Sequence, residues 1–206
     1  MHKLVLGLFL GLFPLVVYAS DDNASDALSL FFKSTESLSA SFVQTNWDEQ
    51  ERVIDQSEGE FVLVKPDSFF WHYKSPFVQK IVAANNKVWF YDVDLEQVTI
   101  KSADKLIGFS PLLFLTGTLD LERDFLVEMD SLTDAVVWLR VTPKEESSSF
   151  EYIRMGLVNG QLWAMEFEDN FGRKTQLQFS DMKVNVTVDS ALFVLTIPDG
   201  VDVFEE

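Results

Sequence analysis

The stretch EFVLVKPDSFFWHYKSPFVQKIVAANNKVWFYDVD, residues 60–94, decides the fold. Its apolar runs are separated by the turn signals Pro66-Asp67-Ser68, Ser75-Pro76 and Asn85-Asn86. This spacing predicts four strands, over residues 60–65, 69–74, 78–84 and 87–93. Connections this short join antiparallel strands, because parallel neighbours need a longer crossover. The stretch therefore predicts an antiparallel meander.

Large apolar side chains occupy both faces of this predicted meander. Phe69 and Trp71 lie on one side and Phe70 on the other, and in the last strand Trp89 alternates with Phe90. A sheet with one face in water would carry polar residues on that face. Either the sheet is covered on both faces, or it curls so that one face lines an interior while helices, loops or a partner shield part of the other. An ordinary barrel core is the simpler alternative.

The first residues are typical of a secretory signal peptide. A basic start at Met1-His2-Lys3 precedes the uncharged apolar run of residues 4–17, and Val17-Tyr18-Ala19 has small residues where signal peptidase reads the chain. The apolar run is shorter than the roughly 20 residues that a membrane span needs. We therefore expect cleavage of residues 1–19 after Ala19, which leaves residues 20–206 as one exported, soluble domain.

The composition excludes several classes of function. The chain has 33 acidic and 16 basic residues, a formal net charge of −17, which argues against nucleic acid and against an anionic membrane surface as partners. The charge suits a free solute that meets membranes only through protein partners, although a halophilic or cold marine origin would produce the same bias. The chain has no cysteine, so it has neither a disulfide framework nor a thiol for a lipid anchor.

The rest of the chain predicts further strands and a few short helices. Ser25 can cap a helix with a broad apolar stripe, Ser110-Pro111 begins a helix that Gly117 ends, and residues 188–192 predict a short turn or helix. Further strands are predicted over residues 40–47, 96–102, 125–129, 135–142, 150–157, 161–168, 173–180 and 193–197. The fold class is mainly β, with about 10–11 antiparallel strands in a curled sheet or barrel and helices laid across an opening.

Catalytic equipment is scarce. His72 has no G-x-S-x-G elbow or other nucleophile near it, so we interpret it as structural. A zinc site needs several His or Cys ligands, which the chain lacks. Acidic side chains alternate over residues 92–96, but Gln97 stands where a calcium loop of the EF-hand type needs its glycine. We therefore predict no catalytic residue, no metal site and no cofactor.

The remaining signal is an excess of large apolar side chains. We interpret them either as core packing or as the lining of a cavity for an apolar ligand, closed by the helix of residues 111–116. These side chains are Phe31, Phe32, Phe61, Phe69, Phe70, Trp71, Trp89, Phe90, Tyr91, Leu112, Leu113, Phe114 and Leu115.

Several short motifs occur in a specific order along residues 20–206. They are LSASFVQ (38–44), a KP…FxW core within residues 59–73, VWFYD (88–92) followed by LEQV (95–98), Ser110-Pro111 with its apolar helix, TPK (142–144), DNFGRKT (169–175) and PDGVDV (198–203). In this order and spacing they resemble the LolA family of periplasmic outer-membrane lipoprotein carriers. The resemblance covers essentially all of the chain beyond the predicted leader.

The resemblance implies an unclosed antiparallel β-barrel with short α-helices that form a lid over a hydrophobic cavity. It implies a monomeric periplasmic carrier, not an enzyme, that accepts triacylated lipoproteins from an inner-membrane ABC transporter complex and delivers them to an outer-membrane receptor. The residues expected to bind acyl chains are Phe32, Phe69, Trp71, Trp89, Phe90, Tyr91, Leu112, Phe114 and Leu115. A carrier of another lipid or glycolipid, an exported hydrolase and a plain protein-binding module are the alternatives.

One residue departs from the family's pattern. The family commonly has an arginine before the proline of the first meander strand, where it is thought to hold the lid through helix carbonyls, and here Lys65 precedes Pro66. A lysine supplies the charge but lacks the planar fork of a guanidinium. We therefore predict that Lys65 is a lid latch that holds less firmly. A lysine solvated at a strand end is the alternative.

Overall fold

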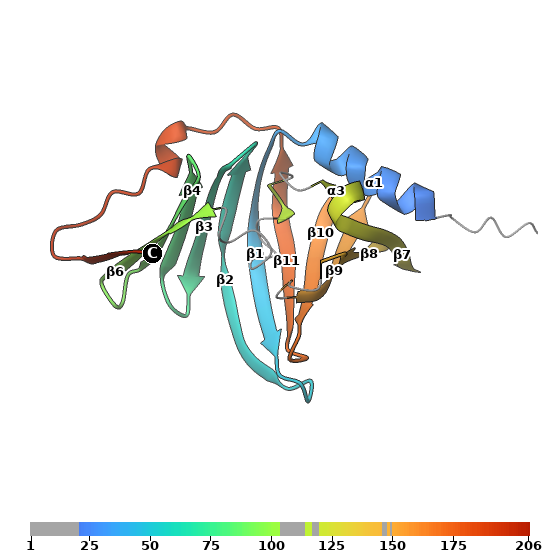
Figure 1. The fold of residues 1–206 in the computed structure, drawn as a ribbon, viewed down its shortest axis with the longest axis horizontal. Helices are drawn as coiled ribbons and strands as arrows, with labels where there is room; N and C mark the ends of the chain where they lie inside the picture. Colours follow the sequence, from blue (N-terminus) through green and yellow to red (C-terminus); the bar gives the residue numbers. More distant parts are fainter. Residues whose placement is uncertain (1–20, 104–113, 117–119, 146–147, 149) are drawn as a thin grey trace, which may run out of the picture.

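The computed structural model describes residues 21–103, 114–116, 120–145, 148 and 150–206, and these residues contain one twelve-stranded sheet (Figure 1). The strands are β1 Ser37–Trp47, β2 Val53–Val64, β3 Ser68–Ser75, β4 Gln79–Ala84, β5 Lys87–Asp92, β6 Gln97–Ser102, β7 Phe125–Thr133, β8 Val136–Pro143, β9 Phe150–Val158, β10 Gln161–Asp169, β11 Lys174–Val184 and β12 Asp202–Glu205. Their order across the sheet is β12-β6-β5-β4-β3-β2-β1-β11-β10-β9-β8-β7. The predicted meander is therefore confirmed as β2 to β5.

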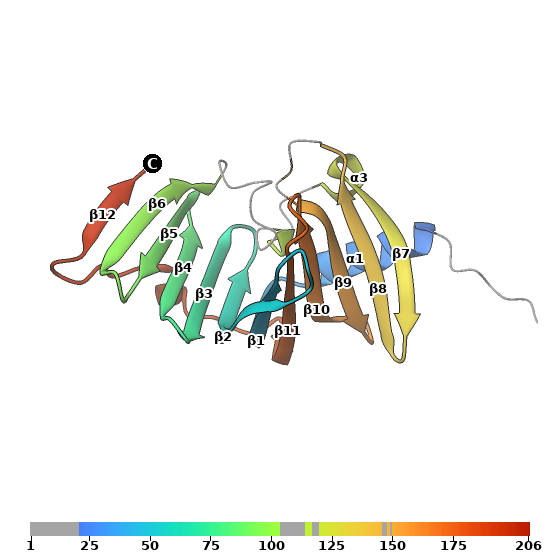
Figure 2. The same ribbon diagram turned by 90° about the horizontal axis from the view of Figure 1, so that it is seen from below.

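The sheet is open. Its edge strands β12 and β7 lie at opposite ends of the molecule (Figure 2), so the sheet does not close into a barrel. All neighbours are antiparallel except β12 and β6, which run parallel. The mainly β, unclosed architecture is confirmed, with twelve strands rather than the expected 10–11.

The strand predicted over residues 193–197 is wrong. Phe193 instead ends a 3₁₀ helix, η2 Ser190–Phe193, which Asp189 caps by accepting a hydrogen bond from the Ala191 backbone N–H at 2.9 Å. The terminal strand comes later, as β12, whose four exposed residues pair with β6 along the edge of the sheet. The buried Phe193 side chain favours the helical turn, because this conformation directs the ring onto the sheet.

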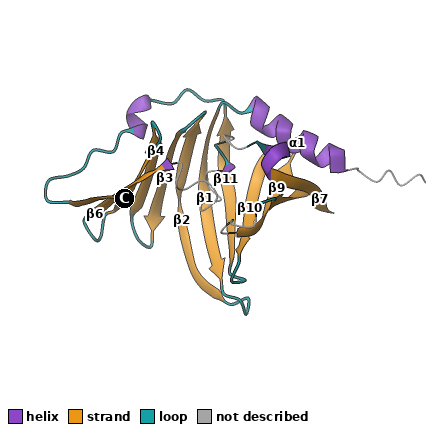
Figure 3. Ribbon diagram, in the orientation of Figure 1, coloured by secondary structure: helices purple, strands orange, loops and turns teal. Residues whose placement is uncertain are grey.

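Within the described ranges the sheet is accompanied by the α-helices α1 Asp21–Ser34 and α3 Leu121–Asp124. Figure 3 shows α1, α3 and η2 along the upper margin of the sheet. The predicted helix of residues 111–116 lies largely outside the described residues, although Phe114, Leu115 and Thr116 are described and buried. Within the described part of the chain, no helix is long and apolar enough to cross a membrane.

Register assigns each side chain to one of two faces. Phe61, Trp71, Ile81 and Phe90 stand directly opposite one another on successive strands, so they share a face, which we call the inner face. The inner face packs against the apolar side of α1 in one continuous core, whose α1 members include Leu28. The face on the other side of the strands is called the outer face.

Candidate acyl-chain site

The centre of the inner face is an aromatic stack around Trp71. The ring of Phe42 lies 4.2 Å from the Trp71 ring and that of Phe61 lies 5.1 Å away, both stacked, as measured between ring centroids. Gly59 makes room for this stack, because a Cβ there would lie 2.0 Å from the backbone oxygen of His72 and 2.7 Å from the Phe42 ring. These strands thus present a continuous aromatic surface on the inner face.

Two polar groups lie within this apolar surface. The hydroxyl of Tyr73 donates a hydrogen bond to Oε1 of Gln44 at 2.9 Å, and burial raises the pKa of Tyr73 to about 12 against an opposing effect of the neighbouring Trp71 indole. The buried Trp71 indole N–H has no hydrogen-bond acceptor among the described residues. An unsatisfied buried donor costs about 1–3 kcal/mol, so this group is available to any acceptor that reaches it.

A second aromatic chain joins α1 to the far edge of the sheet. Phe32 on α1 meets Phe114 edge to face with 5.4 Å between ring centroids, and Phe114 meets Phe125 at the start of β7 with 5.2 Å. Phe31 and Leu115 are buried in the same core. The described end of the predicted lid segment, residues 114–116, therefore lies between α1 and β7.

Lys65 lies at the end of β2 beside the last turn of α1. Its Nζ donates a hydrogen bond to the backbone oxygen of Phe32 and lies 5.5 Å from the centroid of the Phe32 ring. Burial lowers the pKa of Lys65, and the charge of Glu36 opposes that change. Its backbone N–H donates to the oxygen of Glu36 at 2.9 Å. The lysine therefore joins the sheet to the carbonyl end of α1, which a lysine solvated at a strand end would not do.

The structure separates the nine residues expected to bind acyl chains. Phe32, Phe69, Trp71, Phe90, Phe114 and Leu115 belong to the inner-face core or pack against it. Trp89 and Tyr91 lie on the outer face, because Trp89 stands opposite Val82 and Ile100 while Phe90 stands opposite Ile81. They cannot line a cavity on the inner face, and their expected place there is corrected. Leu112 lies outside the described residues.

The inner-face aromatic groups are packed against one another in this structure. Phe69, Trp71, Phe114 and Leu115 are each less than 8% exposed. A cavity of about 240 Å³ lies between α1 and α3, below the roughly 300–1,000 Å³ of typical ligand pockets. Its lining is Ser29, Phe32, Lys33, Phe114, Asp120, Leu121 and Glu122. The described residues therefore show a packed core, which has to open before an acyl chain can reach these aromatic groups.

The other candidate chemistry gains no support from the geometry. His72 points to the outer face, where its Nδ1 lies 3.5 Å from Oε1 of Glu60 in a cluster with Lys74. No group of three or more His, Cys, Asp or Glu side chains in the described part of the chain could hold a metal ion. In the turn after β5, Asp92 accepts a hydrogen bond from the Leu95 backbone N–H at 3.0 Å, as a solvated turn does.

Sequence reasoning missed two members of the inner-face aromatic surface. Phe42 alternates with polar residues in β1, so the period-two pattern identified its strand but not the partner of its ring. Phe125 begins β7, whose strand was predicted. The four-residue helix α3 directly before it was not, because it is too short to show a periodic pattern. Their ring contacts, with Trp71 and with Phe114, join segments far apart in sequence.

Comparison with known proteins agrees with this geometry. The family model described as "Outer membrane lipoprotein carrier protein LolA" matches residues 33–196. An "Outer-membrane lipoprotein carrier protein" of Methylococcus capsulatus is 41% identical over 179 residues, which cover 87% of this chain and 86% of the relative. A protein of the same name from Dechloromonas aromatica is 36% identical over 205 residues, which cover 100% and 97% of the two chains.

Solved structures share the fold at low identity. An uncharacterized conserved protein from Thermus thermophilus aligns with a TM-score of 0.57 at 13% identity and covers 89% of this chain and 99% of its own. This likeness concerns the fold alone. Since the family model matches most of the sequence and relatives above 30% identity span nearly all of it, the chain belongs to the outer-membrane lipoprotein carrier family LolA.

Proposed function

We propose that this protein is a periplasmic lipoprotein carrier that accepts triacylated lipoproteins from an inner-membrane ABC transporter complex and delivers them to an outer-membrane receptor. Residues 1–19 are its cleaved signal peptide. The inner-face aromatic surface, which shares one core with α1 and residues 114–116, carries the proposal, because it can cover acyl chains once this core opens. The names of the relatives support the same cargo.

The energetics explain why such a surface is needed. Three acyl chains of about 16 carbons expose methylene groups whose transfer to water costs roughly 35–40 kcal/mol, at about 0.8 kcal/mol per group. A membrane and an apolar cavity hide these groups about equally well. The direction of transfer therefore depends on smaller terms, such as the free energy needed to part α1 from the sheet.

The unpaired indole of Trp71 adds support. Acylated cysteine carries ester and amide carbonyl oxygens, which are hydrogen-bond acceptors. The Trp71 N–H is a buried donor without an acceptor among the described residues, and it lies among the aromatic rings that would contact the chains. A carbonyl group that reached this donor would satisfy it.

Mass spectrometry of the mature protein from a detergent-free periplasmic extract tests the proposal. We expect triacylated lipoproteins to co-purify. Free lipids or glycolipids alone would favour the alternative carrier, and a turnover activity lost in His72→Ala would favour the hydrolase. A protein that is repeatedly empty and takes up no apolar dye would contradict the acyl-chain site.

The proposed latch predicts a specific change in binding. Lys65→Leu removes the hydrogen bond to the Phe32 carbonyl, so the open state gains population and a fluorescent acyl probe should bind up to about tenfold more tightly. Hand-over to the receptor should slow correspondingly. Lys65→Arg keeps a donor and adds the planar fork, so the probe should bind it no more tightly than the wild type. Lys183→Leu removes an exposed charge elsewhere and should behave like the wild type. Unchanged probe binding and hand-over in Lys65→Leu would contradict a latch.

A further inference from the structure

Two loops at one end of the sheet have the same construction. One joins β1 to β2 through Asp48–Arg52, and the other joins β10 to β11 through Asp169–Arg173, within the DNFGRKT motif. In each loop one aspartate oxygen accepts backbone N–H groups two and four residues later, at 2.9–3.0 Å. The other oxygen accepts the arginine Nε, at 2.8 Å in the first loop and 2.7 Å in the second.

The backbone of the two loops is also the same. The residue before the arginine has a positive φ in both, 60° at Glu51 and 77° at Gly172. Its N–H donates to the aspartate carbonyl at 3.0 Å in each loop, and the aspartate N–H donates to the arginine carbonyl at 3.0 Å. One local solution has thus been built twice, from different sequences.

The two loops differ at their central position. Gln50 occupies it in the first loop and accepts a hydrogen bond from Arg52, whereas Phe171 occupies it in the second. The Phe171 side chain is 76% exposed, with the guanidinium of Arg173 at 5.7 Å from the ring centroid. Because glutamine fills the same position in the matching loop, the loop geometry does not require an aromatic residue. An exposed phenylalanine also stabilises the fold little.

The Phe171 loop is braced on both sides. Nδ2 of Asn170 donates to the backbone oxygen of Ser148 at 2.8 Å, and Nζ of Lys174 lies 3.1 Å from Oε1 of Glu51 in the matching loop. A hollow of about 450 Å³ lies beside the ring, lined by Asp48, Glu49, Gln50, Phe171 and Arg173. An exposed aromatic group on a fixed support loses little conformational entropy when it binds, as binding anchors do.

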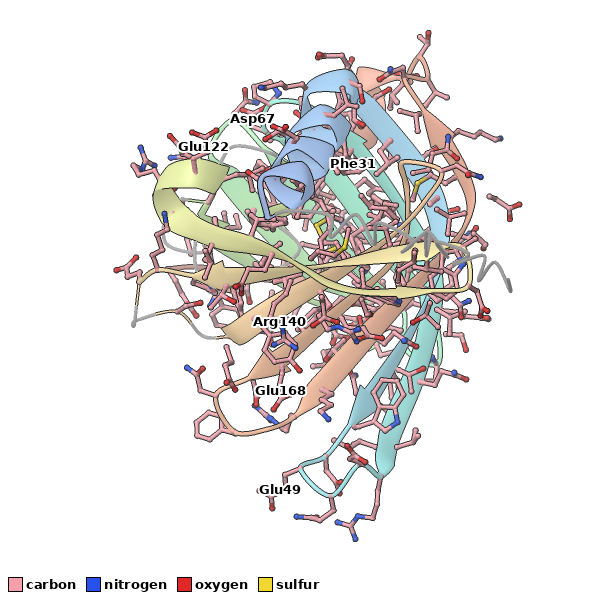
Figure 4. All side chains as sticks on the ribbon, turned by 90° about the vertical axis from the view of Figure 1, so that its right-hand side faces the viewer. Phe31, Glu49, Asp67, Glu122, Arg140 and Glu168 are labelled. Carbon is pink, nitrogen blue, oxygen red and sulfur yellow. The ribbon has the colours of Figure 1, made fainter. Side chains whose placement is uncertain are left out.

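The charge around Phe171 identifies the occupant. Arg52 and Arg173 are paired with the aspartates of their own loops, and Lys174 is paired with Glu51, whereas Glu49 projects from the loop tip (Figure 4). The whole chain carries −17, so an anionic lipid surface would repel the molecule. A protein surface with an apolar pocket flanked by basic side chains complements it.

We infer that the Asp169–Arg173 loop is a docking element for a protein partner, with Phe171 entering an apolar pocket and Glu49 facing a basic group at its rim. The loop lies at the end of the sheet opposite α1 (Figure 1), so a partner held there leaves the closing helix free to move. This inference rests on the proposed function, since it concerns how a carrier is held by a membrane-bound partner.

Sedimentation of the mature chain with membrane vesicles tests the inference. The probes are inner- and outer-membrane vesicles of the producing bacterium, the same vesicles after protease treatment, and protein-free liposomes of phosphatidylethanolamine and phosphatidylglycerol. We expect binding to one class of untreated vesicle only. Phe171→Gln, which installs the side chain of the matching loop, should weaken that binding at least tenfold. Glu49→Lys should weaken it severalfold and reduce its salt dependence.

Matched controls make the result specific. Gln50→Ala alters the same position of the other loop, and Phe77→Gln removes an aromatic side chain that is 71% exposed between β3 and β4. Both should bind within twofold of the wild type, and all variants should unfold at the same urea concentration. Equal binding by Phe171→Gln, an equal loss in Phe77→Gln, Phe171-dependent binding to protein-free liposomes, or Phe171-dependent dimers would each overturn the inference.

Cargo analysis separates this inference from the proposed function. Phe171→Gln should carry the same acylated species as the wild type, because the loop is remote from the inner-face aromatic surface. A wild type that carries no acylated species would contradict the proposed function, while the vesicle comparison would still decide whether Phe171 docks a protein.

Discussion

The two halves of the outer face are built on opposite principles. In one half, the residues that stand opposite one another across β2 to β6 are Val62, Phe70, Val82, Trp89 and Ile100. In the other half, the corresponding residues across β7 to β11 are Glu128, Arg140, Arg154, Glu166 and Gln176. One row is apolar and the other is charged or polar, although both belong to the same continuous sheet.

The apolar half is covered by the chain itself. After β11 the chain crosses to the opposite edge of the sheet (Figure 1), and η2 contacts β3 and β4 on the way. Val82, Val98 and Phe193 are buried although none of them belongs to the inner-face core. The C-terminal segment thus gives this half of the sheet a second core. The two-sided apolar pattern of the meander is explained by cover on both faces.

In the charged half, the side chains of neighbouring strands form ion pairs with one another. Arg140 and Arg154 stand directly opposite each other, which would be repulsive, but Asp130 lies between them at 3.1 Å and 2.7 Å. Asp130 is the extra residue of a β-bulge between Met129 and Ser131, and its carboxylate lies with the two arginines on the outer face. Figure 4 shows Arg140 on the side of these strands away from α1. In this half, ion pairs between side chains stabilise the outer face, whereas in the apolar half the C-terminal segment covers it.

The largest effect is expected from uncovering the apolar half. Phe193→Ala removes the buried ring that anchors η2, so we expect the free energy of unfolding to fall by about 3 kcal/mol. Urea titration followed by tryptophan fluorescence measures the loss. Val194→Ala, at an adjacent side chain that is 69% exposed, should change stability by no more than about 0.5 kcal/mol. Similar small losses in both variants would show that the segment does not cover a second core.

The comparison also explains what the sequence could predict. The meander was found because its turns carry Pro66, Ser75-Pro76 and Asn85-Asn86 between alternating apolar runs, which are local signals. The first half of β2 was missed, because Val53 to Glu58 are exposed and their strand is specified by pairing with β1. The parallel pairing of β12 with β6 was missed for the same reason, since it joins residues about a hundred positions apart.

The site was only partly predictable for a related reason. Trp89 and Phe90 are neighbours of similar size, and nothing in their strand says which of them faces the inner core. That choice depends on segments distant in sequence, which form the inner-face core on one side and include the C-terminal segment on the other. Lys65 was found because its place before Pro66 resembles a family motif, but its acceptor, the carbonyl of Phe32, became visible only in the fold.

A smaller effect is expected from breaking the charged half. Asp130→Asn removes the carboxylate that separates Arg140 from Arg154, so we expect a loss of about 1–2 kcal/mol at pH 7, allowing for solvent screening of partly exposed groups. Urea titration in low salt measures it. Glu151→Gln removes one exposed negative charge from β9 and serves as the control, with no measurable change expected. An unchanged midpoint in Asp130→Asn would mean that the two arginines avoid each other without this carboxylate.

The smallest expected effect is a pH dependence of the stability that the Asp130 carboxylate contributes. Burial opposes ionisation of Asp130, but hydrogen bonds from Arg154 and Arg140 outweigh it and hold the pKa of Asp130 below its usual value near 3.8. A carboxyl whose folded pKa is lowered stabilises the fold above its unfolded pKa, and this contribution is lost as pH falls toward the folded pKa. The difference in stability between wild type and Asp130→Asn should therefore be constant from pH 7 to about pH 5 and shrink below pH 4.

Other carboxyls with lowered pKa values, such as Asp48 and Asp169, remain in both proteins and cancel in the difference. Urea midpoints at half-unit intervals from pH 3 to pH 7 would measure it, and a difference independent of pH would mean that Asp130 acts through packing and neutral hydrogen bonds rather than through its charge.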